Sequence, residues 1–239
     1  MKYLLVLILV VSFSSCTNYD EKMRKFDASF TKMRKITSAN VLNHELILGR
    51  PYIIHYADSS VVIYDDINDS IFTLIDLRDN NSVYHFGKRG EGNNEFLQVF
   101  SLCSLYGDSL IGVYDVYKRT LVEMNLRQIK QGNIQFPVLM QDSLMSLNIC
   151  PTQYDTYLGL GFYENNMFSL TGKHIGSRYY YEYPYRDKQE KEVKNRLRGM
   201  AYQGTLSSNK SLNRFVFAIG SAPIFSLYSV NKDNIDKSF

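Results

Sequence analysis

The chain of 239 residues is poor in several residue types, and each scarcity is informative. It has no tryptophan and only five prolines and 14 glycines, which excludes collagen-like and proline-rich linker sequences. Its net charge of +3 is too small to indicate binding to nucleic acid, so no nucleic-acid partner is expected. Hydrophobic residues make up 45% of the chain and charged residues 21%, a balance typical of a globular protein.

Long apolar runs are also lacking, and the longest one lies at the amino end. It runs from Tyr3 to Val11 and follows the single charge of Lys2. A membrane-spanning helix needs about 20 apolar residues, so this run predicts a cleaved export signal over residues 1–15. Ser14-Ser15-Cys16 resembles the lipobox of bacterial lipoproteins, which implies cleavage before Cys16 and acylation of that residue. The alternative is an ordinary secreted protein in which Cys16 has no special role.

Residues 16–40 are predicted to be a tether between the lipid and a folded domain over residues 41–239. Several acyl chains on Cys16 would form a stable membrane anchor. Asp20 and Glu21 resemble the acidic export signals of some lipoproteins of Gram-negative bacteria. We therefore expect a cell-envelope location at the outer membrane, on either its periplasmic or its exposed face.

The domain contains a repeated segment. Residues 58–65 and 108–115 both begin with Asp-Ser, end with Tyr-Asp and are separated by 50 residues. Looser copies begin near Asp155 and Asn213. Each copy reads as an apolar strand, a polar turn and a second strand, and the 18 asparagines and 15 aspartates supply the turns.

A repeat of about 50 residues with several strands is typical of the blades of a β-propeller. The expected fold is therefore all-β, with multi-stranded antiparallel blades. The spacing of the copies predicts four to five blades. The carboxyl end, from Asp233 onward, shows no evident closing strand.

Residues 85–96, with Gly87, Gly90 and Gly92, resemble the glycine-rich segment of TolB-like six-bladed propeller lipoproteins of Gram-negative bacteria. The resemblance covers residues 40–235 and includes residues 201–204. It implies a propeller fold and an envelope address, but no reaction. Six blades would need roughly 300 residues at this repeat length, so we expect an incomplete ring or a truncated six-bladed product.

Motifs that carry chemistry are scarce. The glycine-rich segment could hold a phosphate, but its spacing fits a crossover between blades better. Histidines at 44, 55, 85 and 174 have no metal-ligand spacing. No nucleophile elbow is present, so no catalytic, metal or cofactor-binding residue and no cofactor is assigned. Cys103 and Cys150 are expected to be free and buried, with a disulfide between them left open.

Two segments are candidates for contacts. Residues 187–198 predict a short helical insertion whose apolar stripe of Val193, Leu197 and Met200 packs on the propeller or on a partner. Before it, alternating tyrosines predict a strand with four rings on one side. These rings are candidate ligand contacts, with packing between blades as the alternative: Tyr179, Tyr181, Tyr183 and Tyr185.

The sequence therefore favours a lipid-anchored envelope propeller that binds a protein or a glycan. Two alternatives stay open: a propeller enzyme, such as a hydrolase or lyase, with a polar site in its central channel, and a structural accessory of an envelope complex. Converging titratable side chains at a channel mouth would favour the enzyme, whereas exposed aromatic side chains would favour the binding protein.

Overall fold

A computed structural model describes residues 46–238, and the strands of this part form four antiparallel sheets of four strands and one two-stranded sheet. The first sheet contains β1 (Pro51–Ala57), β2 (Ser60–Asp65), β3 (Phe72–Asp76) and β4 (Ser82–Phe86). The second contains β7 (Val99–Ser104), β8 (Leu110–Asp115), β9 (Thr120–Asn125) and β10 (Val138–Gln141). The third contains β11 (Asn148–Pro151), β12 (Thr156–Leu160), β13 (Phe168–Gly172) and β14 (Gly176–Tyr180). The fourth contains β15 (Gly204–Ser208), β16 (Arg214–Ile219), β17 (Phe225–Asn231) and β18 (Asn234–Lys237).

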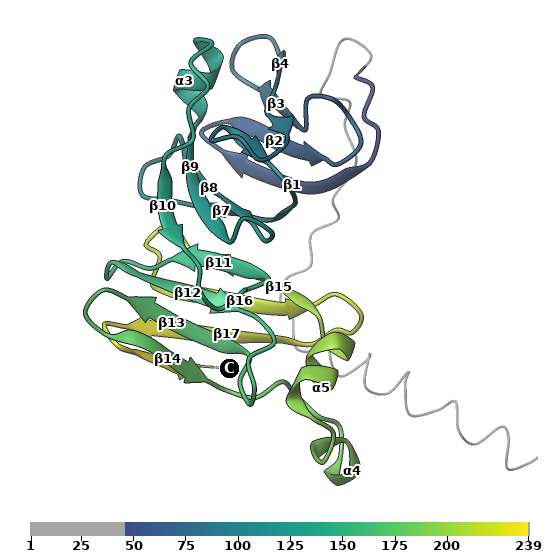
Figure 1. The fold of residues 1–239 in the computed structure, drawn as a ribbon, viewed down its shortest axis with the longest axis vertical. Helices are drawn as coiled ribbons and strands as arrows, with labels where there is room; N and C mark the ends of the chain where they lie inside the picture. Colours follow the sequence, from purple (N-terminus) through teal and green to yellow (C-terminus); the bar gives the residue numbers. More distant parts are fainter. Residues whose placement is uncertain (1–45, 239) are drawn as a thin grey trace, which may run out of the picture. The chain divides into compact units, whose positions relative to one another are not determined.

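Each four-stranded sheet is a blade in which consecutive strands pair as antiparallel neighbours (Figure 1). The four repeated segments of the sequence are the two central strands of the four blades, β2–β3, β8–β9, β12–β13 and β16–β17. The expectation of strands in these segments is confirmed. The carboxyl end differs from its expectation, because β18 pairs with β17 and completes the fourth blade.

The repeated Tyr-Asp pair ends the second strand of the first two blades. Asp65 is fully buried, and its carboxylate accepts hydrogen bonds from the backbone N–H groups of Gly49, Arg50 and Ile67. Asp115 does the same in the second blade. Each carboxylate thereby connects the turn after its own strand to the segment that leads into the inner strand of the same blade, which explains the repeat.

The blades bury two apolar clusters. One cluster combines the first and second blades, where the ring of Phe72 stacks on Phe86 and meets Phe96 edge-on. The other combines mainly the third and fourth blades, where Phe168 meets Tyr228 with ring centroids 4.8 Å apart. Each blade thus covers a neighbour's apolar face, the packing that makes adjacent blades stable together.

The first strands of the blades are neighbours. β1 contacts β7, β7 contacts β11, and β11 contacts β15. Within residues 46–238 these contacts run in one row from β1 to β15, and the ring is not closed. The structure therefore shows four blades, the lower of the two predicted numbers.

In the described part of the chain, three short helices interrupt the strands: α3 (Leu126–Lys130), α4 (Lys188–Lys191) and α5 (Asn195–Ala201). The helical insertion predicted near residues 187–198 is confirmed, but it consists of two helices separated at Glu192–Lys194, the second of which ends at Ala201. Its predicted start is correct, because Asp187 accepts a hydrogen bond from the N–H of Glu190. Figure 1 shows α4 and α5 beyond β14, with α5 beside β15. In the part that the structure describes, no helix has the length and apolar character needed to cross a membrane.

Candidate functional site

The hairpin loops that follow the inner strands gather at one end of these strands, here called the loop mouth. The loops comprise residues 58–59, 105–109, 152–155 and 209–213. The N–H of Gln153 donates to the carbonyl of Leu212, which joins the loops of the third and fourth blades. A cavity of about 290 Å³ touches the loops of the first, second and fourth blades, and one of about 210 Å³ touches those of the second and third.

Three tyrosines with exposed side chains lie at or next to this mouth. Tyr56, on the end of β1, is 64% exposed, Tyr106 is 53% exposed and Tyr154 is 37% exposed. They come from three successive blades. Tyr106 lies close enough to Tyr154 and Asp155 for their negative charges to act on its hydroxyl group. Burial and these neighbours raise the pKa of Tyr106, so its hydroxyl stays protonated at neutral pH.

Sequence analysis missed these tyrosines, although a signal for them exists. Tyr56 and Tyr106 each stand two residues before the aspartate that begins a repeat, and Tyr154 stands directly before Asp155. A tyrosine one or two residues before the repeat aspartate therefore recurs in three blades.

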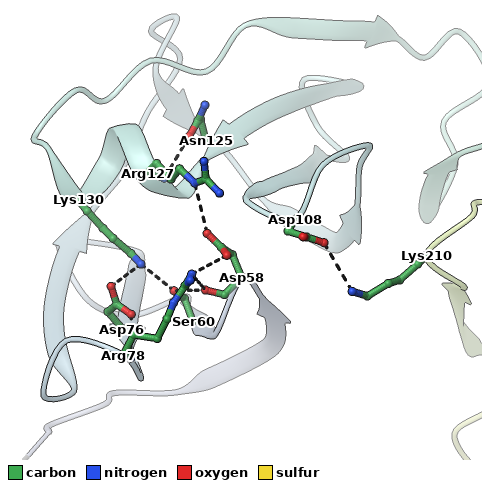
Figure 2. A network of polar contacts seen from close by, with 9 residues as sticks. All are labelled: Asp58, Ser60, Asp76, Arg78, Asp108, Asn125, Arg127, Lys130 and Lys210. Atoms are coloured by element: carbon green, nitrogen blue, oxygen red, sulfur yellow. Dashed lines mark hydrogen bonds and ion pairs between the residues drawn. The ribbon is translucent and has the colours of Figure 1, made fainter.

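Charged side chains form a network beside the mouth (Figure 2). Arg78 donates to the Asp58 carboxylate over 2.5 Å, and Arg127 lies 3.5 Å from its other oxygen. Lys130 donates to Asp76 over 2.5 Å. Figure 2 shows Arg127 and Lys130 reaching from α3 toward the first blade.

Asn125 explains how α3 presents these cations. Its side-chain oxygen accepts hydrogen bonds from the N–H groups of Arg127 and Gln128, which is the usual way to begin a helix. The helix is only five residues long, so its first and last turns hold Arg127 and Lys130 within reach of the neighbouring blade.

The network keeps its carboxylates ionised. Partial burial raises the pKa of Asp58, but the hydrogen bond and charge of Arg78 and the charge of Arg127 outweigh it, and the net shift is downward. Burial also raises the pKa of Asp76, but the hydrogen bond and the charge of Lys130 outweigh burial, and the net shift is downward. A carboxylate with a lowered pKa is a poor proton donor near neutral pH, so these residues are not suited to general acid catalysis. They fit a structural or docking role better.

A second, more exposed pair of charges lies at the mouth itself. Lys210, from the fourth blade, lies 3.6 Å from Asp108 of the second blade, and both side chains are largely exposed. Such a pair contributes little to stability in water. Both groups are therefore available to a ligand at low energetic cost.

The four candidate tyrosines near residue 180 do not form one surface. β14 ends at Tyr180, and Tyr181 has a positive φ of 53°, so the predicted alternation along one strand is wrong. Tyr183 is 1% exposed and donates a hydrogen bond to the carbonyl of Gly161, which removes it from any contact surface. Tyr181 is half-buried, and its hydroxyl joins the third blade to β18 through Ile235.

The outer two tyrosines stay exposed at 45% each. Tyr179 packs against the ring of Tyr163, and Tyr185 lies under the cations of Lys191 and Arg198. Their role as ligand contacts stays a prediction.

The glycine-rich segment forms the crossover from the first blade to the second. β5 (Lys88–Arg89) pairs in parallel with β6 (Glu95–Phe96), and the Glu95 carboxylate accepts a hydrogen bond from the N–H of Gly92. A Cβ atom at Gly90 would lie 2.2 Å from this carboxylate, so the close turn requires glycine. Glu95 occupies the space that a phosphate would need, which favours the structural interpretation.

Carboxamides line another cavity, of about 670 Å³, on the outer side of the second blade. They are Asn93, Asn94, Asn125, Gln128 and Gln135. Glu123 and the apolar Phe136, Pro137 and Val138 complete the lining. Amide side chains both donate and accept hydrogen bonds, so this cavity is suited to a neutral ligand rich in hydroxyl groups.

The remaining candidate residues have structural surroundings. Cys103 and Cys150 are free and buried, as expected, and a hydrogen bond with Cys103 together with burial raises the pKa of Cys150 well above its ordinary value. His85 bonds to Thr73, and His55 is largely buried, which lowers its pKa. No group of three potential metal ligands is found within residues 46–238. The export signal, Cys16, the tether and His44 lie outside the described residues.

A family model described as TolB-like 6-blade propeller-like matches residues 29–238. The chain belongs to this family. Membership in the TolB-like family agrees with the four antiparallel blades and with the glycine-rich crossover.

Solved structures give more distant similarities. One is a protein from Bacteroides fragilis NCTC 9343 described as exported, at 11% identity and a TM-score of 0.48, covering 82% of this chain and 52% of the other. Another is hydrazine synthase of Kuenenia stuttgartiensis, at 9% identity and a TM-score of 0.43, covering 82% and 49%. This TolB-like chain thus spans about half the length of the solved structures it matches. No curated protein sequence matches it.

Proposed function

We propose that the chain is a lipid-anchored interaction protein of the cell envelope that binds a partner protein at its loop mouth. The observation that carries this proposal is the placement of Tyr56, Tyr106 and Tyr154 at or next to the loop mouth in three successive blades, all exposed. Tyrosine offers a broad apolar face and a hydroxyl group and is enriched among residues that dominate binding energies. Asp108 and Lys210 add charges of both signs, which could orient a partner.

The anchor is the second part of the proposal. It is supported by the lipobox-like Ser14-Ser15-Cys16 after a short apolar run. We expect acylation of Cys16 and attachment to the outer membrane, on either of its faces.

Two other functions receive less support. An enzyme would need several titratable groups converging on one point of the mouth, but Asp58 is tied to two arginines and Asp108 has the exposed Lys210 beside it. A glycan ligand is favoured by a different observation, the amide-lined cavity beside Gln128 and Gln135.

Site-specific crosslinking in living cells tests the proposal. The photoreactive amino acid p-benzoylphenylalanine replaces Tyr106 or Tyr154, and the matched control replaces Tyr117. Tyr117 is 66% exposed but follows β8 at the opposite end of the same blade from Tyr106. We expect one and the same protein adduct from positions 106 and 154 and none from position 117.

The adduct should also weaken when Lys210 is replaced by Glu, because this change reverses a charge at the mouth. No protein adduct from positions 106 and 154, or equal adducts from all three positions, would contradict a protein-binding mouth. A glycan ligand would give the first of these results.

A further inference from the structure

α5 is oriented opposite to an ordinary surface helix. It buries Asn195, Arg198 and Gly199 and exposes the side chains between them. The amide of Asn195 accepts from the N–H of Tyr183 and donates to the carbonyls of Tyr163 and Asn166. The polar face of this helix therefore attaches it to the third blade.

The exposed side of α5 carries the apolar Leu197 and Met200, which are 55% and 56% exposed. Val193, in the link between α4 and α5, is 40% exposed. At 100° per residue, Leu197 and Met200 lie near the centre of the outward face. The prediction that this stripe packs on its own propeller is therefore wrong. Gly199 faces the propeller instead. It lies against Phe162, and no room is left there for a larger side chain.

Cations surround this apolar ridge. Between Glu182 and Ala201 the chain carries six Lys or Arg and four Asp or Glu, an excess of two positive charges. Among the described residues, Lys191, Lys194 and Arg196 form no ion pair, and all three are exposed. Tyr185 lies in the same segment, half-exposed beneath Lys191.

We propose that this ridge of Val193, Leu197 and Met200 docks on an anionic lipid surface. Exposed aliphatic side chains can enter the boundary between headgroups and acyl chains, while the long stems of lysine and arginine keep their charges at the phosphates. Tyrosine favours the same boundary. A projecting ridge needs no complementary groove when its partner is a fluid bilayer.

A second copy of the chain fits the ridge less well. A two-fold symmetric contact brings the same patch of both copies together, so the excess of two positive charges would stand on both sides of the contact. Like charges at close range oppose such a contact. The lipid proposal does not depend on acylation of Cys16, because it concerns a separate surface.

The absence of tryptophan makes a direct test possible. Leu197→Trp places a single tryptophan on the ridge of the full-length chain, and Val138→Trp places one at a 60% exposed position on β10 as the control. Vesicles of phosphatidylcholine with or without phosphatidylglycerol are added. We expect the emission of the ridge tryptophan to shift to shorter wavelength with the anionic vesicles only. The emission of the control tryptophan should stay unchanged even where the amino end holds the chain on the membrane.

Charge reduction is the second arm. Replacing Lys191, Lys194 and Arg196 by Gln in the Leu197→Trp chain should lower the affinity for anionic vesicles about fivefold per residue. Equal shifts in the Leu197→Trp and Val138→Trp chains, or no shift in the Leu197→Trp chain, would overturn the proposal. So would a blue-shifted emission of the Leu197→Trp chain without lipid that reverses on dilution, since this result identifies a second copy as the occupant.

Discussion

Asp115 should be one of the most sensitive positions of the second blade. Its carboxylate is 1% exposed. One oxygen accepts hydrogen bonds from Leu97 and Gln98 at 2.6 and 3.3 Å, and the other accepts from Tyr117 and Lys118 at 3.0 Å each. Asp115→Ala removes all four acceptor contacts at once.

The expected cost follows from these bonds. A hydrogen bond to a charged group contributes about 1.5–3 kcal/mol, but four bonds to one carboxylate are not additive and some of the freed N–H groups will reach water. About 1 kcal/mol per bond gives a loss of about 4 kcal/mol in the free energy of unfolding. Asp115→Asn keeps one oxygen and turns an NH₂ group toward the other two donors, so we expect a loss of about 2–3 kcal/mol.

Urea unfolding followed by circular dichroism measures these losses as shifts of the midpoint at constant slope. The control is Asp108→Ala, which removes an exposed carboxylate in the same blade and should change stability by less than about 0.5 kcal/mol. If Asp115→Ala is no more destabilising than Asp108→Ala, the carboxylate does not join the turn to the inner strand as argued.

Two further predictions concern pH and the amino end. Burial raises the pKa of Asp65, but N–H donors, led by that of Arg50, outweigh it and hold the pKa below its ordinary value of 3.8. The stabilisation by Asp65 should therefore be present above the unfolded-state pKa and be lost as the pH falls through the lower folded-state pKa. The Asp65→Asn chain lacks this carboxylate, so its stability should fall less than that of the unchanged chain below about pH 4. Equal acid-unfolding profiles of the two chains would contradict this. For the anchor, mass spectrometry of the mature chain should find acyl groups on Cys16, and Cys16→Ala should abolish them; an unmodified Cys16 in the membrane fraction would refute lipidation.

The sequence by itself determined the strands, because their pattern is local. Runs of Val, Ile, Tyr and Phe between aspartates and asparagines fix both the strand periodicity and the turns. The Tyr-Asp pairs ending at Asp65 and Asp115 recur because both blades contain a buried turn at this place, and the N–H groups of that turn need a hydrogen-bond acceptor. The start of α4 at Asp187 was also readable, since a helix cap involves only neighbouring residues.

The tertiary structure alone decided which side chains face a partner. Tyr183 and Tyr185 are two residues apart in sequence, yet one is buried and the other is half-exposed, because the left-handed residue Tyr181 ends the alternation. The apolar stripe of α5 predicted a buried face, but Gly199 and Asn195 fit the third blade more closely than Leu197 could. The loop mouth brings together residues about 50 positions apart, and such proximity arises only when the inner strands of successive blades lie side by side.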